Sequence, residues 1–253
     1  MQRRTYITGV AMATVAAAVV ATLAGAGSAT TTAGGGTRSS HGVMAEGVDH
    51  LPSTTAADWV TYADHVIAVT ATAEKIAPPA QSEIERGEGF LGRTVTLRVD
   101  SVLWSRGEAP RPAPQIFDYP AVGAVFTEGA TDSPTPMALR NRPRLQTGHH
   151  YILAIEWEPA HCTDGDTPEP AQWRGLGEGS ELPYDDNTIG QGESEGAIQT
   201  ADHARALAVQ AGPAGGLKEQ LAGTTADTLV SALKAAAPAQ RRQSSPQSAA
   251  DCP

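Results

Sequence analysis

Alternating apolar and polar side chains predict β-strands over the middle of the chain. The clearest segment runs from Thr94 to Asp100 and alternates at every residue. Beyond it the apolar positions move by one residue, to Val102 and Trp104, and a β-bulge produces such a shift inside a strand. We therefore predict a bulged strand, with the bulge near Asp100 and Ser101. The apolar residues on its inner face are Val95, Leu97 and Val99.

Shorter apolar and β-branched runs predict the remaining strands. These strands are expected at residues 66–72, 115–117 and 150–157, with one more around Trp173 and Leu176. The run at 150–157 is apolar on both faces, so we expect it to be buried on both sides for part of its length. The polar segments 81–92 and 128–144 are interrupted by glycine or proline and predict loops.

Helices are expected on either side of this strand region. Thr55 and Asp58 have the spacing of a capping box, which predicts a helix from Thr55 to about Asp64. After residue 200 the apolar residues recur at helical spacing, and short helices are expected. They are residues 201–211, 217–221 and 225–236, the last of them stopped by Pro238.

The N-terminus has the parts of an export signal. Arg3 and Arg4 precede an apolar run from Tyr6 to Ala26, and small residues up to Ala29 fit a cleavage site. Two alternatives stay open. The paired arginines resemble a twin-arginine signal, and the run is long enough to remain as an uncleaved membrane anchor. Each of them predicts a protein that acts outside the cytoplasm.

These patterns divide the chain into successive segments. We expect a signal peptide or anchor at 1–29, a flexible linker at 30–54, a β-rich domain at 55–199, short helices at 200–237 and a disordered tail at 238–253. The predicted fold class is α+β. It consists of a small, mostly antiparallel β-barrel or curled sheet with an N-terminal helix and short C-terminal helices.

Three phrases in the strand region resemble a class of small secreted bacterial domains. The phrases are Ala63–Ile67, Val95–Trp104 and Leu145–Leu153. Domains of this class are similar to the closed barrels of the oligonucleotide/oligosaccharide-binding and tissue-inhibitor-of-metalloproteinase types, so the resemblance implies such a barrel. The cysteine-led N-terminus of the inhibitors is absent here, and their inhibitory function is not carried over.

The two cysteines, Cys162 and Cys252, agree with export. Outside the reducing cytosol such a pair predicts a disulfide, which would close a loop of about 90 residues and tether the tail. In the chain-entropy model a crosslink of this span stabilises a protein by about 4 kcal/mol. The alternative is two unrelated thiols.

Composition and charge narrow the class of partner. The formal net charge is −10, and an acidic surface repels phosphate backbones, so nucleic-acid binding is not expected. The abundance of alanine and glycine is typical of a GC-rich, actinobacterial-type genome. We expect membrane contact only through an uncleaved N-terminal segment, and the expected partner is a protein or a glycan at the cell surface.

Acidic residues gather between His161 and Gly196 and suggest a metal ion. Hard cations prefer clustered carboxylates, so an irregular calcium site is one alternative. Its candidate ligands are Glu181, Asp185, Asp186 and Glu193, and the site could also draw on Glu178 and Glu195. The other alternative is a solvated acidic loop, in a protein without a cofactor. His161 and its neighbours include residue types that bind metals, but we expect Cys162 in the disulfide instead.

The sequence contains no assembled catalytic motif. It lacks a Gly-x-Ser-x-Gly elbow, a Walker loop, a dinucleotide fingerprint and a His-Glu-x-x-His pair. The function we expect is therefore non-enzymatic, that of a secreted binding or structural protein of the cell envelope or extracellular space. The alternative is an extracellular hydrolase with its site in the acidic loop at 161–195.

Overall fold

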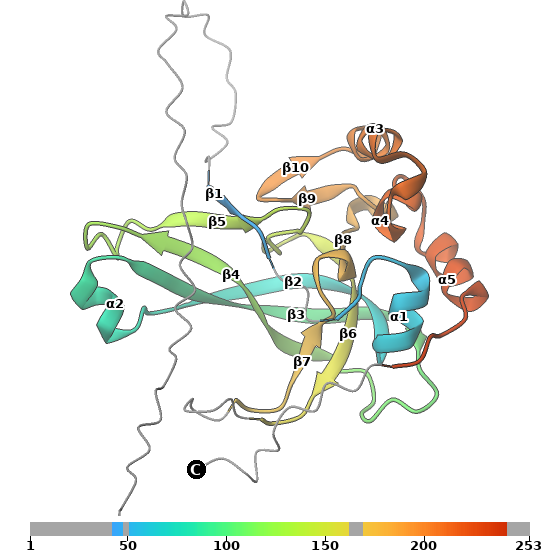
Figure 1. The fold of residues 1–253 in the computed structure, drawn as a ribbon, viewed down its shortest axis with the longest axis horizontal. Coiled ribbons are helices and arrows are strands. Elements are labelled where there is room, and N and C mark those ends of the chain that lie inside the picture. The colour runs from blue at the N-terminus through green and yellow to red at the C-terminus, as the bar shows by residue number, and fades with distance from the viewer. Residues whose placement is uncertain (1–41, 48–50, 162–168, 242–253) are drawn as a thin grey trace, which may run out of the picture. The chain divides into compact units, whose positions relative to one another are not determined.

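The fold is α+β and is built on one large mixed sheet (Figure 1). The computed structural model describes residues 42–47, 51–161 and 169–241. The strands of the large sheet are β1 (Val43–Ala45), β2 (His65–Ala77), β3 (Gly89–Ser105), β4 (Ile116–Phe126), β5 (Thr135–Leu139), β6 (His150–Glu158), β7 (Gln172–Gly175) and β8 (Glu181–Pro183). Their order is β1-β5-β4-β3-β2-β6-β7, and β8 also pairs with β6. All of these pairs are antiparallel except β1 with β5.

A separate hairpin and several helices complete the described chain. The hairpin consists of β9 (Gly192–Ser194) and β10 (Ala197–Gln199). The α-helices are α1 (Ala56–Tyr62), α2 (Gln81–Arg86), α3 (Ala201–Ala211), α4 (Leu217–Gln220) and α5 (Ala226–Ala235). Short 3₁₀ turns occupy Glu178–Ser180, Asp185–Asn187 and Gly212–Ala214.

The predicted bulged strand is confirmed as the central part of β3. Its inner-face residues Val95 and Leu97 are fully buried. In the ladder with β2, Val99 and Ser101 have partners, and Asp100 between them is the extra residue. The bulge therefore lies where the shift of the apolar positions predicts it.

Strand β6 is buried on both faces, as predicted. Ile152 and Ala154 belong to a core that also contains residues of α1, α4 and α5. Leu153 and Ile155 belong to a second core, formed with β2, β3 and β4. Because successive side chains of a strand point to opposite faces, one strand serves both cores. Burying each leucine or isoleucine contributes about 1.5–3 kcal/mol.

The predicted helices are confirmed. Helix α1 begins at the capping box, where Asp58 N donates to Thr55 Oγ1 at 3.0 Å and Thr55 N donates to the Asp58 carboxylate at 2.9 Å. Trp59 of this helix is fully buried, and its Nε1 donates to Ser53 O at 2.8 Å. Helices α3, α4 and α5 lie at the predicted positions after residue 200.

Helix α2 corrects the prediction of a loop at 81–92. Ala80 N donates to the Glu83 carboxylate at 2.8 Å, which caps the start of the helix. Gly87 ends it with a φ of 79°, a left-handed conformation that glycine adopts without strain. A helix of this length, exposed along its sides, leaves too weak an apolar period to be read from the sequence.

Strands β1 and β5 correct two further predictions. The segment 128–144 was expected to be a loop and 30–54 a linker, but residues 43–45 pair in parallel with residues 137–139. Short strands at a sheet edge are held mainly by backbone hydrogen bonds, and these leave no alternation of side chains in the sequence.

The sheet curls without closing. In the described strand order β1 and β7 are the end strands and do not pair with each other, so the closed barrel that the resemblance implies is not formed. The curl brings Tyr119 of β4 against Gly175 of β7, although β3, β2 and β6 separate these strands in the sheet. A Cβ at Gly175 would overlap the Tyr119 hydroxyl, so glycine is needed at this approach.

Several predictions concern residues outside the described ranges. They are the export signal at 1–29, the disulfide between Cys162 and Cys252, and most of the tail. Within the described ranges, no helix has both the length and the apolar character needed to cross a membrane.

Candidate functional site

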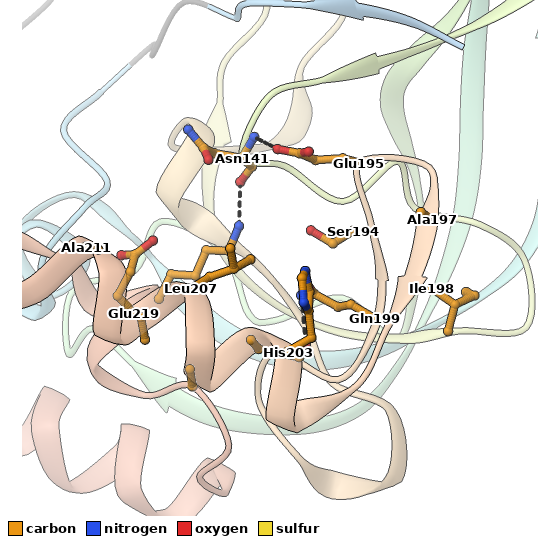
Figure 2. A pocket seen from close by; sticks show the side chains of 15 residues that line it. Asn141, Ser194, Glu195, Ala197, Ile198, Gln199, His203, Leu207, Ala211 and Glu219 are labelled. Carbon is orange, nitrogen blue, oxygen red and sulfur yellow. Dashed lines mark hydrogen bonds between the residues drawn. The ribbon is translucent and has the colours of Figure 1, made fainter. Parts of the chain in front are cut away.

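A cavity of about 450 Å³ opens between the β9–β10 hairpin and helices α3 and α4 (Figure 2). This volume falls in the range of small-molecule sites. Its polar lining residues are Asn141, Ser194, Glu195, Gln199, His203, Lys218 and Glu219. The rest of the lining is apolar, and half of these residues belong to α3.

The hairpin turn forms one rim of the cavity. Glu195 and Gly196 have positive φ angles of 55° and 84°, and they connect the paired residues Ser194 and Ala197. Positive φ at both central residues characterises the type I′ turn, a common connection in two-residue hairpins. Glu195 N donates to Arg142 O at 2.9 Å, and this bond ties the turn to the loop that precedes β6.

Helix α3 forms the apolar wall. Thr200 caps its first turn by accepting a hydrogen bond from His203 N at 3.2 Å. Helical spacing places one row of apolar residues toward the cavity. The row consists of Ala204, Leu207, Ala208 and Ala211. Gly190 lies against this row with a φ of 86°, and a Cβ there would be 2.8 Å from the Cβ of Ala204.

Lys218 of α4 brings a cation to the cavity. Its Nζ donates to Asn141 O at 3.0 Å. Asn141 N in turn donates to Glu195 Oε1 at 2.5 Å (Figure 2). Asn141 has a φ of 60°, a left-handed conformation that asparagine tolerates better than most residues. Consecutive hydrogen bonds therefore link α4, the loop before β6 and the hairpin turn.

Burial lowers the pKa of Lys218 from its usual value of 10.5. Loss of hydration around the ammonium is the largest cause, and the charges of nearby glutamates, Glu219 first among them, oppose it only in part. In the described part of the chain, no carboxylate lies within ion-pair distance of Nζ. A desolvated ammonium without a close counter-ion gains from an anionic ligand, which supplies the missing interaction.

The lining therefore combines three properties: a cation at Lys218, carboxylates at Glu195 and Glu219, and an apolar wall. No family model, curated protein or solved structure matches this chain. Its function is therefore inferred from this arrangement of groups and from the carboxylates that surround it.

Glu193, a predicted calcium ligand, is fully buried next to the hairpin turn. One carboxylate oxygen accepts from Arg144 N at 2.9 Å and from Gly196 N at 2.7 Å. The other accepts from Leu145 N and from the Tyr151 hydroxyl, both at 3.0 Å. Burial, and after it the charge of Glu193, raises the pKa of the Tyr151 hydroxyl. Glu193 thus joins the turn to the loop before β6.

Glu181, also a predicted calcium ligand, is buried inside the curl of the sheet. It accepts a hydrogen bond from the Tyr119 hydroxyl at 2.6 Å and pairs with the Arg142 guanidinium. Burial is the main cause that raises the pKa of the Tyr119 hydroxyl, and the charge of Glu181 adds to it. This carboxylate is part of the interior hydrogen bonding of the fold.

Asp185 and Asp186 have partners of their own. The Asp185 carboxylate lies 2.6 Å from His149 Nδ1 and accepts from His150 N at 2.8 Å. Asp186 accepts from Gln191 Nε2 at 2.6 Å. Over the described residues, none of the predicted calcium ligands belongs to a group of side chains close enough to share one metal ion. Calcium binding by them stays a prediction.

The sequence pattern pointed to one polar residue of this cavity, Glu195, as a possible calcium ligand, and not to the others. Lys218 is one of three lysines in the chain, and this scarcity is the signal that could have drawn attention to it. Asn141, Ser194 and His203 stand in segments without a recognisable motif. They meet only because the hairpin folds back onto α3 and α4.

Proposed function

We propose that the protein acts outside the cytoplasm as a non-catalytic binding protein, and that the Lys218 cavity takes a small zwitterion with an aliphatic side chain. A free aliphatic amino acid has this chemistry. The observation that carries the proposal is the desolvated Lys218 ammonium, which shares one cavity with the carboxylates of Glu195 and Glu219.

Each part of such a ligand has a counterpart in the lining. An ammonium has three N–H donors, so Lys218 can bind a ligand carboxylate while it keeps its bond to Asn141. The ligand ammonium is complementary to Glu219, which lines the same cavity. The aliphatic part fits the row around Leu207, and burying a leucine-sized side chain contributes about 1.5–3 kcal/mol.

The polar residues of the cavity favour binding over hydrolysis. Ser194 and His203 both line it, but no hydrogen bond joins their side chains in the described structure. A serine hydroxyl needs a base within hydrogen-bond reach to become a nucleophile. The alternative of an extracellular hydrolase therefore has less support at this site than a binding role.

Calorimetric titration of the exported chain with L-leucine tests the proposal. We expect saturable binding. Lys218→Met should weaken the affinity about 10- to 100-fold, which corresponds to the loss of one hydrogen bond to a charged group. Lys75→Met removes the same charge from an exposed position on β2 and should leave the affinity unchanged. Equal affinity of the Lys218→Met variant and the wild type, or no binding of leucine by the wild type, would contradict the proposal.

A second titration separates the two charges of the ligand. The probe is 4-methylpentanoate, which keeps the carboxylate and the branched chain of leucine but lacks the ammonium. We expect it to bind more weakly than leucine, because Glu219 then has no cation to pair with. Glu219→Gln should lower the affinity for leucine, because the ligand ammonium loses its partner. It should not lower the affinity for 4-methylpentanoate, because the variant removes a negative charge near the bound carboxylate.

A further inference from the structure

A second group of ligand-bearing side chains lies where the β6–β7 hairpin continues beyond its regular strands. Glu158, His161 and Glu169 each offer one ligand atom, and these atoms all lie within 4.8 Å of one another. None of the three residues lines the Lys218 cavity. The group is therefore independent of the function proposed above.

The backbone holds two of these side chains face to face. His161 and Glu169 form an antiparallel bridge, with His161 N donating to Glu169 O at 3.1 Å and Glu169 N donating to His161 O at 2.8 Å. Directly opposed residues of such a pair have their side chains on the same face of the ladder. The imidazole and the carboxylate are therefore brought together by main-chain hydrogen bonds.

The His161 ring is prepared to act as a metal ligand. The residue is only 9% exposed, and Nδ1 lies 3.3 Å from Pro159 O. A contact of Nδ1 with a carbonyl places the ring proton on that nitrogen and leaves Nε2 with its lone pair. In the described ranges Nε2 has no hydrogen-bond partner. Metal-bound histidines are oriented in this way by a carbonyl behind them.

Glu158 is held from the side of β7. It is buried, and its two carboxylate oxygens lie 3.0 and 2.9 Å from Nη1 of Arg174. Carboxylates that bind metals usually accept hydrogen bonds from neighbouring groups as well, which fix their direction. The pairing with Arg174 is thus compatible with a further bond from Glu158 to a cation.

The donor types select among metals. Calcium and magnesium prefer oxygen donors alone, whereas zinc accepts imidazole nitrogen together with carboxylate oxygen. We propose that Glu158, His161 and Glu169 form a zinc site with three protein ligands. Zinc sites with three protein ligands keep a coordination position for water or another small ligand, and exposed Glu169 leaves this site open to solvent.

Titration of the protein with zinc chloride tests the site. Calorimetry measures the binding, and thermal unfolding measures the stabilisation of the fold. We expect one zinc ion to bind per chain and to raise the melting temperature, because the ion binds the folded state. His161→Ala should weaken zinc binding by at least about 10- to 100-fold. Glu169→Gln changes an exposed side chain, so it keeps the fold and should weaken binding as well. Glu85→Gln, on the exposed face of α2, is the matched control with unchanged affinity.

The absorption spectrum of the cobalt(II) form identifies the donors. Nitrogen and oxygen ligands give d–d bands without the intense near-ultraviolet band of a thiolate bound to cobalt. Such a spectrum supports the three proposed ligands. A strong thiolate band, an absence of zinc binding in the wild type, or zinc affinity unchanged in both His161→Ala and Glu169→Gln would overturn the proposal.

Discussion

The half-buried Lys218 differs from the buried carboxylates in how its charge is balanced. Glu193 and Glu181 accept hydrogen bonds from several donors of the chain itself, including the hydroxyls of Tyr151 and Tyr119. Lys218 donates to the carbonyl of Asn141, and burial lowers its pKa. Such an imbalance lowers stability and is typical of binding sites, where the ligand completes the pairing.

Replacing Lys218 should therefore make the free protein no less stable. The lowered pKa means that the ammonium is disfavoured in the fold, so the unfolded chain binds more protons in the pH range just below 10.5. Stability of the wild type then rises with pH through this range. At pH 7 we expect the free energy of unfolding of Lys218→Met to equal or exceed that of the wild type. This difference should become smaller as the pH approaches 10.5. Urea unfolding at several pH values measures this difference. A stability difference that increases with pH would contradict the lowered pKa of Lys218.

Tyr151 should make the fold sensitive to alkali. Its pKa is raised in the folded state, chiefly by burial, so its contribution to stability is present below the unfolded value of 10.0 and is lost as the pH rises above it. Tyr151→Phe should cost about 1–3 kcal/mol at neutral pH, because Glu193 loses a donor. The variant should also lose stability less steeply than the wild type above pH 10. If the free energies of unfolding of the wild type and of Tyr151→Phe fall equally steeply above pH 10, this account of Tyr151 is wrong.

At the scale of elements, small residues bring the hairpin side of the cavity and helix α3 together. Gly190 has a positive φ and lies against Ala204 of the helix. The capping box at Thr55 predicted helix α1, since a cap is a local signal, and the helical spacing of apolar residues predicted α3. The hairpin and the cavity could not be predicted, because β9 and β10 are three residues each and the cavity is lined by segments that are distant in sequence.

Gly190→Ala should disturb the cavity while leaving the sheet intact. An alanine at a φ of 86° is strained, and its Cβ would lie 2.8 Å from the Cβ of Ala204. We expect a loss of about 1–3 kcal/mol in the free energy of unfolding together with weaker binding of leucine. Chemical denaturation and calorimetry measure the two effects. Ala204→Gly in the same chain removes the Ala204 Cβ and should restore part of the leucine affinity.

At the scale of the whole molecule, the sheet curls far enough to bury a network of tyrosine, arginine and glutamate side chains. Alternation predicted the central part of β3, and an apolar run predicted β6. The extent of the curl could not be predicted, because it depends on the meeting of Tyr119 with Gly175 across the sheet. Strands β1 and β5 were missed for a similar reason: they are short and pair with each other across a long stretch of chain. The lining residues of the cavity likewise come together through tertiary contacts, and they form no sequence motif.

The most direct test of the central claim is the ionisation of Lys218 itself. The chain has three lysines, so nitrogen-15 labelling of lysine gives few side-chain ammonium signals to assign. We predict that leucine raises the pKa of Lys218, because the ligand carboxylate stabilises the ammonium. A pKa of Lys218 that stays the same at saturating leucine would show that the cavity does not bind the ligand through this residue.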